Sequence, residues 1–262
     1  MTLKIATWNV NSVRSRITHL LDWLRADSPD IVLLQELKVM NDGFPYMEIE
    51  ELGYNVAVHG QKTYNGVAIL SKLPLSDIST VLPGEDTDLE ARYIEAVASG
   101  KGYALRVASV YVPNGQSPDS DKFQYKLRFF GRLGSHIATL LPLEEILVLG
   151  GDYNVAPQAI DVYDPKGLDG TCCYHPLERA AFHAIENLGV YDAFRILHPG
   201  KQVFTWWDYR GNGFEAGKGM RIDHLLLSPQ AADKLQACDT ATGLRSLEKP
   251  SDHIPVVGVF EV

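Results

Sequence analysis

The chain has 262 residues, of which 45% are hydrophobic and 22% charged, and its formal net charge is −9. This composition is typical of a globular protein and is enough to bury a substantial core. The negative balance argues against a protein that coats nucleic acid nonspecifically, because such binding depends on basic surface. It does not exclude a nuclease, which can gather its basic residues on one face.

The chain shows no Pro/Gly/Ser-rich linker, low-complexity tract or internal repeat, so we expect a single domain spanning residues 1–262. It also lacks a signal-peptide pattern and any apolar run of transmembrane length, which predicts a cytoplasmic protein without membrane contact. Three cysteines, Cys172, Cys173 and Cys238, fit neither a disulfide framework nor a zinc-binding spacing. We interpret them as reduced residues without a chemical role.

The first 36 residues predict a strand, a helix and a second strand. Residues 5–8 form a short apolar strand, and residues 16–25 carry Ile17, Leu20 and Leu24 at helical spacing. Residues 31–35 form an apolar strand that runs into Glu36. Further strands are expected over residues 54–58, 66–70, 93–98 and 104–112.

A long amphipathic helix is predicted over residues 121–141. Its apolar stripe consists of Phe123, Leu127, Phe130, Leu133 and Ile137. Its other faces are expected to carry Lys122, Lys126, Arg128 and Arg132. Charge alone favours a solvated face over a partial phosphate-binding surface.

The central strand, residues 146–149, is apolar throughout and leads into Gly150, Gly151, Asp152, Tyr153 and Asn154. Such a run indicates a strand covered on both faces, so its polar residues must project from the end. A helix over residues 176–187 and strands from residue 221 and over residues 256–260 complete the pattern. About ten strands with few helices predict an α/β fold with two packed sheets flanked by helices.

Polar side chains stand at the ends of several of these apolar strands. They are Asn9, Asn11, Glu36, Tyr111, Asn114, Asp152, Asn154, Asp223, Asp252 and His253. Each alone has a simpler explanation as a helix cap, a turn former or a satisfied core residue. Burying this many polar side chains without a function would cost a large amount of folding free energy. The set therefore favours one shared functional site.

Carboxylate and amide oxygens without partnering cysteines suit a hard divalent cation, Mg²⁺ or Mn²⁺. Mg²⁺ takes one or two protein carboxylates and leaves its other positions to water and phosphate, which favours Glu36 and Asp252 as its ligands. The remaining groups are then free for acid–base work, and the residues predict a metal-assisted hydrolase.

Seven motifs resemble the exonuclease III family of apurinic/apyrimidinic (AP) endonucleases, over essentially the whole chain and in the expected order. They are TWNVNSVR from Thr7, LQELK from Leu34, YVPNG from Tyr111, GDYNVAP from Gly151, TWWDYR from Thr205, RID from Arg221 and SDH from Ser251. The acidic motifs also mark the wider superfamily of DNase I and phosphoinositide phosphatases. The YVPNG and TWWDYR motifs narrow the resemblance to the DNA-repair branch.

This resemblance implies a four-layer α/β sandwich and Mg²⁺-dependent cleavage of the phosphodiester 5′ to an abasic site, leaving a 3′-hydroxyl. It also implies accessory 3′-exonuclease, 3′-phosphatase or 3′-phosphodiesterase activity. The expected partner is duplex DNA with abasic sites or blocked 3′ ends, and the expected state is a monomer. Mn²⁺ is expected to substitute for Mg²⁺.

Carried over from the family, Glu36 and Asp252 bind the metal with help from Asn9 or Asn11. Asp152 handles the proton that moves in the reaction. The assignment of general base and general acid among the carboxylates stays open at this point.

The resemblance assigns the other polar groups to the phosphate. Asn154 orients water or the transition state, and Tyr111 contacts a phosphate or leaving oxygen. Asp223 pairs with His253 and holds an imidazole that donates to phosphate. Positioned donors of this kind stabilise charge that develops on phosphate oxygens.

By the same resemblance, Trp206, Met220 and Ile222 line a pocket for a flipped-out abasic sugar, which shape would distinguish from an intact nucleotide. Trp207 is expected in the core. Further candidates for substrate binding are Asn114, Lys122, Lys126 and Arg210.

Residues 170–175 match no family motif that we recognise, which leaves the balance of activities open. One alternative is an enzyme of the same fold that acts mainly as a 3′-exonuclease or 3′-phosphatase. A second is a superfamily phosphatase for small phosphoesters or lipids, against which the TWWDYR motif weighs. A third is a catalytically inactive DNA-binding module, which the intact acidic motifs disfavour.

Overall fold

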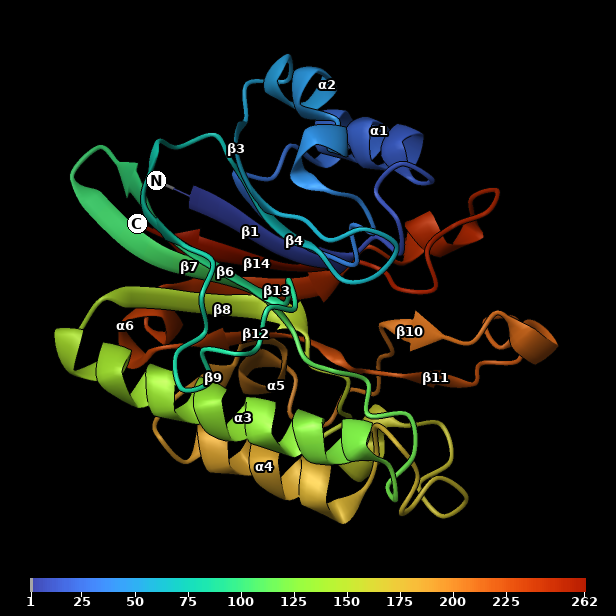
Figure 1. Ribbon diagram of the computed structural model, residues 1–262. Coiled ribbons are helices and arrows are strands. Elements are labelled where there is room, and N and C mark those ends of the chain that lie inside the picture. The colour runs from blue at the N-terminus through green and yellow to red at the C-terminus, as the bar shows by residue number, and fades with distance from the viewer. Residues whose placement is uncertain (1) are drawn as a thin grey trace.

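The computed structural model describes residues 2–262 and contains two six-stranded sheets packed face to face (Figure 1). The first sheet has the order β13-β14-β1-β2-β4-β3, and the second has the order β5-β6-β7-β8-β12-β9. A ribbon of two short strands, β10 and β11, lies beyond one end of the sheets (Figure 1).

The strands of the first sheet are β1 (Thr2–Asn9), β2 (Ile31–Gln35), β3 (Asn55–His59), β4 (Val67–Ser71), β13 (Leu235–Thr240) and β14 (Val256–Glu261). Those of the second sheet are β5 (Leu75–Ser79), β6 (Tyr93–Gly100), β7 (Tyr103–Tyr111), β8 (Ile146–Asp152), β9 (Tyr191–Asp192) and β12 (Asp223–Leu227). The ribbon consists of β10 (Trp206–Trp207) and β11 (Gly219–Met220).

Helices cover the outer face of each sheet and complete four layers (Figure 1). The first sheet is covered by α1 (Ile17–Asp27) and α2 (Tyr46–Glu50), and the second by α3 (Asp121–Leu140) and α4 (Pro176–Glu186). Two short helices, α5 (Ala193–Leu197) and α6 (Pro229–Ala232), lie beside the second sheet. Within residues 2–262, no helix is both long enough and apolar enough to span a bilayer.

The core consists of three apolar layers, because both faces of both sheets are covered. Ile5, Leu33, Val107 and Val148 meet between the sheets. A second layer joins α1 to the first sheet, and a third joins α3 and α4 to the second. Because both faces of each sheet are buried, β2 and β8 have apolar side chains along most of their length instead of an alternating pattern.

The register of the strands brings several polar ends to the same region of the two sheets. Asn9 lies opposite Gln35 in the parallel pair β1 and β2, and Tyr111 lies opposite Asp152 in the parallel pair β7 and β8. Asp223, the first residue of β12, also lies opposite Asp152. The register therefore supports one shared site.

The sequence predicted this architecture well. The fold class is confirmed, and the strand at residues 31–35 and the three long helices are found within two residues of their expected ends. The predicted number of strands was too low, because β5 and β13 are polar and half-exposed and lack an apolar run. The short strands β9, β10 and β11 carry only two residues each and leave no periodic signal.

Candidate active site

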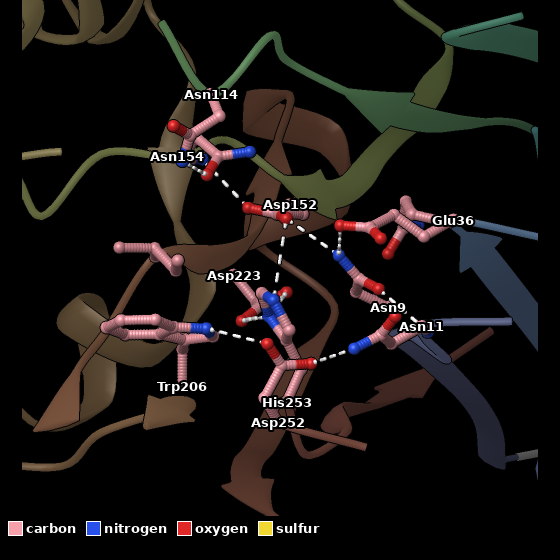
Figure 2. Close-up of polar contacts among 12 residues, drawn as sticks. Asn9, Asn11, Glu36, Asn114, Asp152, Asn154, Trp206, Asp223, Asp252 and His253 are labelled. Atoms are coloured by element: carbon pink, nitrogen blue, oxygen red, sulfur yellow. Dashed lines mark hydrogen bonds and ion pairs between the residues drawn. The ribbon is translucent and has the colours of Figure 1, made fainter. Parts of the chain in front are cut away.

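The polar strand ends converge on one cluster at the end of the sheets nearest the β10–β11 ribbon (Figures 1 and 2). Asn9 is its hub: it is fully buried, and its Nδ2 donates to Glu36 Oε1 at 2.9 Å and to Asp152 Oδ2 at 2.8 Å. The side-chain oxygen of Asn9 accepts from the backbone N–H of Asn11 at 3.0 Å. Asn9 therefore holds a carboxylate of each sheet with its nitrogen, while its oxygen is held by the backbone of Asn11.

Glu36 lies at the centre of a set of donors. Tyr111 donates its hydroxyl to Glu36 Oε1 at 2.8 Å, and Lys38 Nζ lies 2.8 Å from Glu36 Oε2. Burial alone would raise the pKa of Glu36, but Lys38 and the Asn9 hydrogen bond outweigh it and hold this pKa below its usual value. Burial and the neighbouring Glu36 raise the pKa of Tyr111 well above its usual value, so its hydroxyl is a donor at neutral pH.

Asp152 and Asp223 flank the imidazole of His253. Nδ1 of His253 lies 2.9 Å from Asp223 Oδ2, and its Nε2 lies 3.7 Å from Asp152 Oδ2. Burial alone would lower the pKa of His253, but Asp223 and then Asp152 outweigh it and raise this pKa to about 10. The imidazole is therefore protonated at neutral pH and can donate a hydrogen bond to an anion.

The pKa of Asp152 is raised to about 7, first by burial and then by Asp223 and Glu36, against the lowering effect of His253. Its side chain is 1% exposed and accepts hydrogen bonds from Asn9 and from the backbone N–H of Asn154, the latter at 2.9 Å. A carboxyl group with a pKa near neutrality can both take up and release a proton under working conditions.

Asp252 lies at the rim of the cluster (Figure 2). Its Oδ1 accepts from Asn11 Nδ2 at 2.8 Å, and its Oδ2 accepts from the indole N–H of Trp206 at 3.1 Å. Asp252 is outside the group formed by Glu36, Asp152 and His253, whose ligand atoms all lie within 4.8 Å of one another. Of the two carboxylates expected to bind the metal, Glu36 alone belongs to that group.

Three site residues have left-handed backbone conformations, with φ values of 45° at Asn11, 53° at Glu36 and 51° at Asn154. Such values are uncommon for residues other than glycine and cost free energy unless the surroundings hold them. Here they turn the chain sharply after β1, β2 and β8, so that the side chains project into the cluster. Strain of this kind is often found at functional sites.

A buried ion pair supports the second half of the site. Lys126, on α3, is fully buried, and its ammonium group donates to the carbonyl oxygens of Asn114 and Asn154 at 3.1 and 2.6 Å and to Glu178 on α4. Asn114 Nδ2 in turn donates to Asn154 Oδ1 at 2.9 Å. The pair therefore fixes both loops that carry these amides.

The placement of Lys126 on a solvent-facing side of its helix was wrong. Its spacing from Phe123, Phe130 and Leu133 puts it on the buried face, and this spacing could have revealed it. Lys122 is exposed as expected. Leu127 is only partly buried, and Phe129 takes its place in the core.

A pocket of about 380 Å³ includes the cluster, and apolar side chains stand beside the polar groups in its wall. Trp206, Met220 and Ile222 line it, and Arg210 lies at its rim, where it pairs with Asp208. Trp207 is buried and packs on Phe204 and Phe214, as expected for a core residue. A larger hollow of about 620 Å³ runs along α3, but none of the cluster residues faces it, so its size does not identify a site.

The donor set fits a hard divalent cation. Lys38 Nζ lies between Glu36 Oε2 at 2.8 Å and the side-chain oxygen of Asn11 at 2.5 Å, so these oxygens already accommodate a positive charge. The site holds several carboxylates and no cysteine among its innermost groups, and oxygen ligands suit Mg²⁺ or Mn²⁺.

The sequence matches the model of the "Endonuclease/Exonuclease/phosphatase family" over residues 6–253. It is 33% identical to exodeoxyribonuclease III of Haemophilus influenzae, over 99% of this chain and 100% of the relative. It is also 31% identical to the DNA repair nuclease APEX1 of Danio rerio, over 97% of this chain and 81% of the relative.

Solved structures give the same assignment. A 3′ phosphatase from Neisseria bound to a product DNA hairpin matches with a TM-score of 0.96 and 40% identity, over 99% of this chain and 100% of that chain. An AP endonuclease from Archaeoglobus fulgidus matches with a TM-score of 0.94 and 41% identity, over the same shares of the two chains. The chain therefore belongs to the endonuclease/exonuclease/phosphatase family, in its exodeoxyribonuclease III and AP endonuclease branch, and is a nuclease.

Proposed function

We propose that the protein is a Mg²⁺-dependent DNA repair nuclease that cleaves the phosphodiester 5′ to an abasic site in duplex DNA and leaves a 3′-hydroxyl. The single observation that carries this proposal is the apolar wall of Trp206, Met220 and Ile222 in the same pocket that Asp152 and His253 line. This wall offers surface for a sugar and adds no donor for the edge of a base, because the indole N–H of Trp206 already donates to Asp252.

Glu36, Asp252 and the side-chain oxygen of Asn11 would hold the divalent cation, in the region where Lys38 now contacts two of them. When bound, such a cation would neutralise charge on the phosphate oxygens. Asn9 has a different task, because it orients Glu36 and Asp152 through its amide nitrogen.

The chain supplies the proton transfer and the remaining stabilisation of charge. Asp152, with its pKa of about 7, is our general base and takes the proton of the attacking water. The protonated His253, held by Asp223, donates to a phosphate oxygen, and Tyr111 offers a second O–H donor. Asn154 orients the water from a fixed position, since its own Nδ2 is tied to the carbonyl of Val112 at 2.9 Å.

The test is cleavage of an end-labelled duplex that carries one abasic analogue, with Mg²⁺, with Mn²⁺ and with EDTA. We expect a single cut on the 5′ side of the analogue in either metal and none in EDTA. A matched undamaged duplex serves as the control. Equal endonucleolytic cutting of both duplexes would contradict the proposed role of the pocket.

A second candidate function is 3′-end processing as the main activity, by 3′-exonuclease or 3′-phosphatase action. The observation that favours it is the match to the Neisseria 3′ phosphatase, at a TM-score of 0.96 and 40% identity. The Neisseria relative described as a 3′–5′ exonuclease matches with a TM-score of 0.95, as well as the AP endonuclease does. Comparing single-turnover rates on an abasic duplex and on a 3′-phosphate duplex decides between the two.

A further inference from the structure

Two adjacent thiols line the same pocket as the catalytic groups. Cys172 and Cys173 have their Sγ atoms 4.0 Å apart. Cys173 is buried, with Sγ 3.6 Å from Asn114 Nδ2 and 3.8 Å from Asn154 Oδ1, whereas Cys172 is partly exposed at the pocket wall. These cysteines were interpreted as residues without a chemical role, and the structure places two of them in the wall of the pocket.

The surroundings of the two thiols differ in a way that separates their reactivity. A hydrogen bond from Cys173 lowers the pKa of Cys172, and the nearby Lys126 ammonium lowers it further. Burial and the charge of Glu178 act in the opposite direction but do not outweigh these two effects. The same hydrogen bond and burial raise the pKa of Cys173 well above its usual value. Cys172 is thus the thiol that ionises first, and the thiolate is the nucleophilic form of cysteine.

The neutral thiol of Cys172 donates to the carbonyl oxygen of Asn114 at 2.8 Å, an oxygen that also accepts from Lys126. Once ionised, Sγ loses this bond and keeps the thiol of Cys173 as its donor. The partial exposure of Cys172 leaves room for a reagent to approach from the pocket.

We propose that Cys172 is a site of reversible thiolation, at which a small disulfide forms a mixed disulfide and thereby closes the substrate pocket. The thiolate of Cys172 attacks one sulfur of the small disulfide. A new S–S bond forms, the original S–S bond breaks, and the departing thiolate takes up a proton from water. No further oxidant is required, because the small disulfide is itself reduced to one free thiol and one bound half.

A bond between the two cysteines themselves is disfavoured. Neighbouring Cα atoms are about 3.8 Å apart, whereas disulfide-bonded residues usually have Cα atoms about 4.4–6.8 Å apart. Cys173 therefore stays a thiol and acts as a positioning residue that donates to Cys172. The adduct on Cys172 would lie beside Asn114, whose backbone and side-chain oxygens are 2.8 and 3.7 Å from Cys172 Sγ, and a bulky group there blocks access to the cluster.

The experiment treats the full-length protein with oxidised glutathione and follows it by intact mass, peptide mapping and cleavage of the abasic duplex. We expect one glutathionyl group on Cys172, loss of most of the activity, and recovery of both mass and activity with dithiothreitol. Cys238→Ser should behave like the wild type, because Cys238 is fully buried in the core between the sheets. Cys172→Ser should form no adduct, and after treatment with oxidised glutathione it should cleave at the same rate as the untreated Cys172→Ser protein.

Cys173→Ala should slow the thiolation of Cys172, and Cys173→Ser, which keeps a donor, should restore most of the rate. The inference is overturned if no adduct forms on Cys172, or if the adduct forms and both cleavage and DNA binding in EDTA stay unchanged. This inference depends on the proposed function only where the test measures cleavage of the abasic duplex. If untreated protein cuts no abasic duplex, the proposed function fails, while the mass and DNA-binding results still decide this inference.

Discussion

The substitution Asp152→Asn tests the role of the buried carboxylate most sharply, because it changes charge with almost no change in shape. Asp152 accepts from Asn9 at 2.8 Å and from the Asn154 N–H at 2.9 Å, and an asparagine can accept only one of these bonds. The unpaired donor costs ~1–3 kcal/mol, and removal of a buried charge offsets part of that cost. We therefore expect a folded protein that melts a few degrees lower.

Catalysis should fall much further than stability. General acid–base groups contribute ~10²–10⁴-fold to rate, which corresponds to ~2.7–5.4 kcal/mol of transition-state stabilisation. We expect this loss in single-turnover cleavage of the abasic duplex at saturating Mg²⁺, with little change in DNA affinity in EDTA.

Asp239→Asn is the matched control, because the Asp239 side chain is 70% exposed and lies outside the pocket. It should cut at the wild-type rate. A rate for Asp152→Asn within a few-fold of the wild type would refute the proton-transfer role. A fall in rate explained by loss of folded protein in the thermal melt would refute it equally.

Three further predictions follow from the same geometry. Glu36→Ala should raise the Mg²⁺ concentration needed for half-maximal rate, because Glu36 is the ligand carboxylate within the innermost cluster, while DNA affinity in EDTA changes little. Trp206→Ala should lower abasic-site cleavage more than removal of a 3′-phosphate, by ~1 kcal/mol or less, since a sugar offers less stacking surface than a base. The rate should rise as pH increases through about 7, where Asp152 loses its proton, and His253→Gln should move this rise to higher pH because the imidazolium lowers the pKa of Asp152.

Each of these predictions has its own contrary result. An unchanged Mg²⁺ half-saturation point would place the cation away from Glu36. Equal losses of both activities for Trp206→Ala, with a large drop in melting temperature, would mean that the indole serves packing and not recognition. A pH profile that stays in place when His253 is replaced would show that the rise does not report Asp152.

The polar ends of strands could be predicted from the sequence because apolar runs fix where strands stop, and the side chains that follow must lie at one edge of a sheet. Glu36, Asp152 and His253 were identified in this way, and the structure brings them within 4.8 Å of one another. The resemblance of the motifs then supplied the family, which the comparisons confirm.

The sequence could not give the details that depend on backbone turns and long-range pairing. The left-handed conformations of Asn11 and Glu36 decide which way their side chains point. Asparagine adopts this conformation more often than most residues do, but glutamate rarely does, and the sequence does not show where either adopts it. The bond from Trp206 to Asp252 joins segments 46 residues apart and places this acid at the rim, outside the innermost cluster.

The contacts of residues 172 and 173 beside the reaction site could not be predicted from the sequence for a similar reason. The loop that carries them has no periodic pattern, and bonds to other segments fix it. The Cys173 backbone N–H donates to Glu178 at 3.2 Å, and the Cys173 carbonyl oxygen accepts from the Ala156 N–H at 2.8 Å. Contacts of this kind join segments far apart in sequence.

The most direct test of the proposed activity identifies the product made from a duplex with a single abasic analogue. The 5′-labelled strand is incubated with protein and Mg²⁺, and the shortened fragment is then offered to a DNA polymerase with no other treatment. Our account predicts a fragment that ends immediately 5′ to the analogue and is extended at once, because it carries a 3′-hydroxyl. An abasic strand that stays intact while a 3′-phosphate on a companion duplex is removed would contradict it.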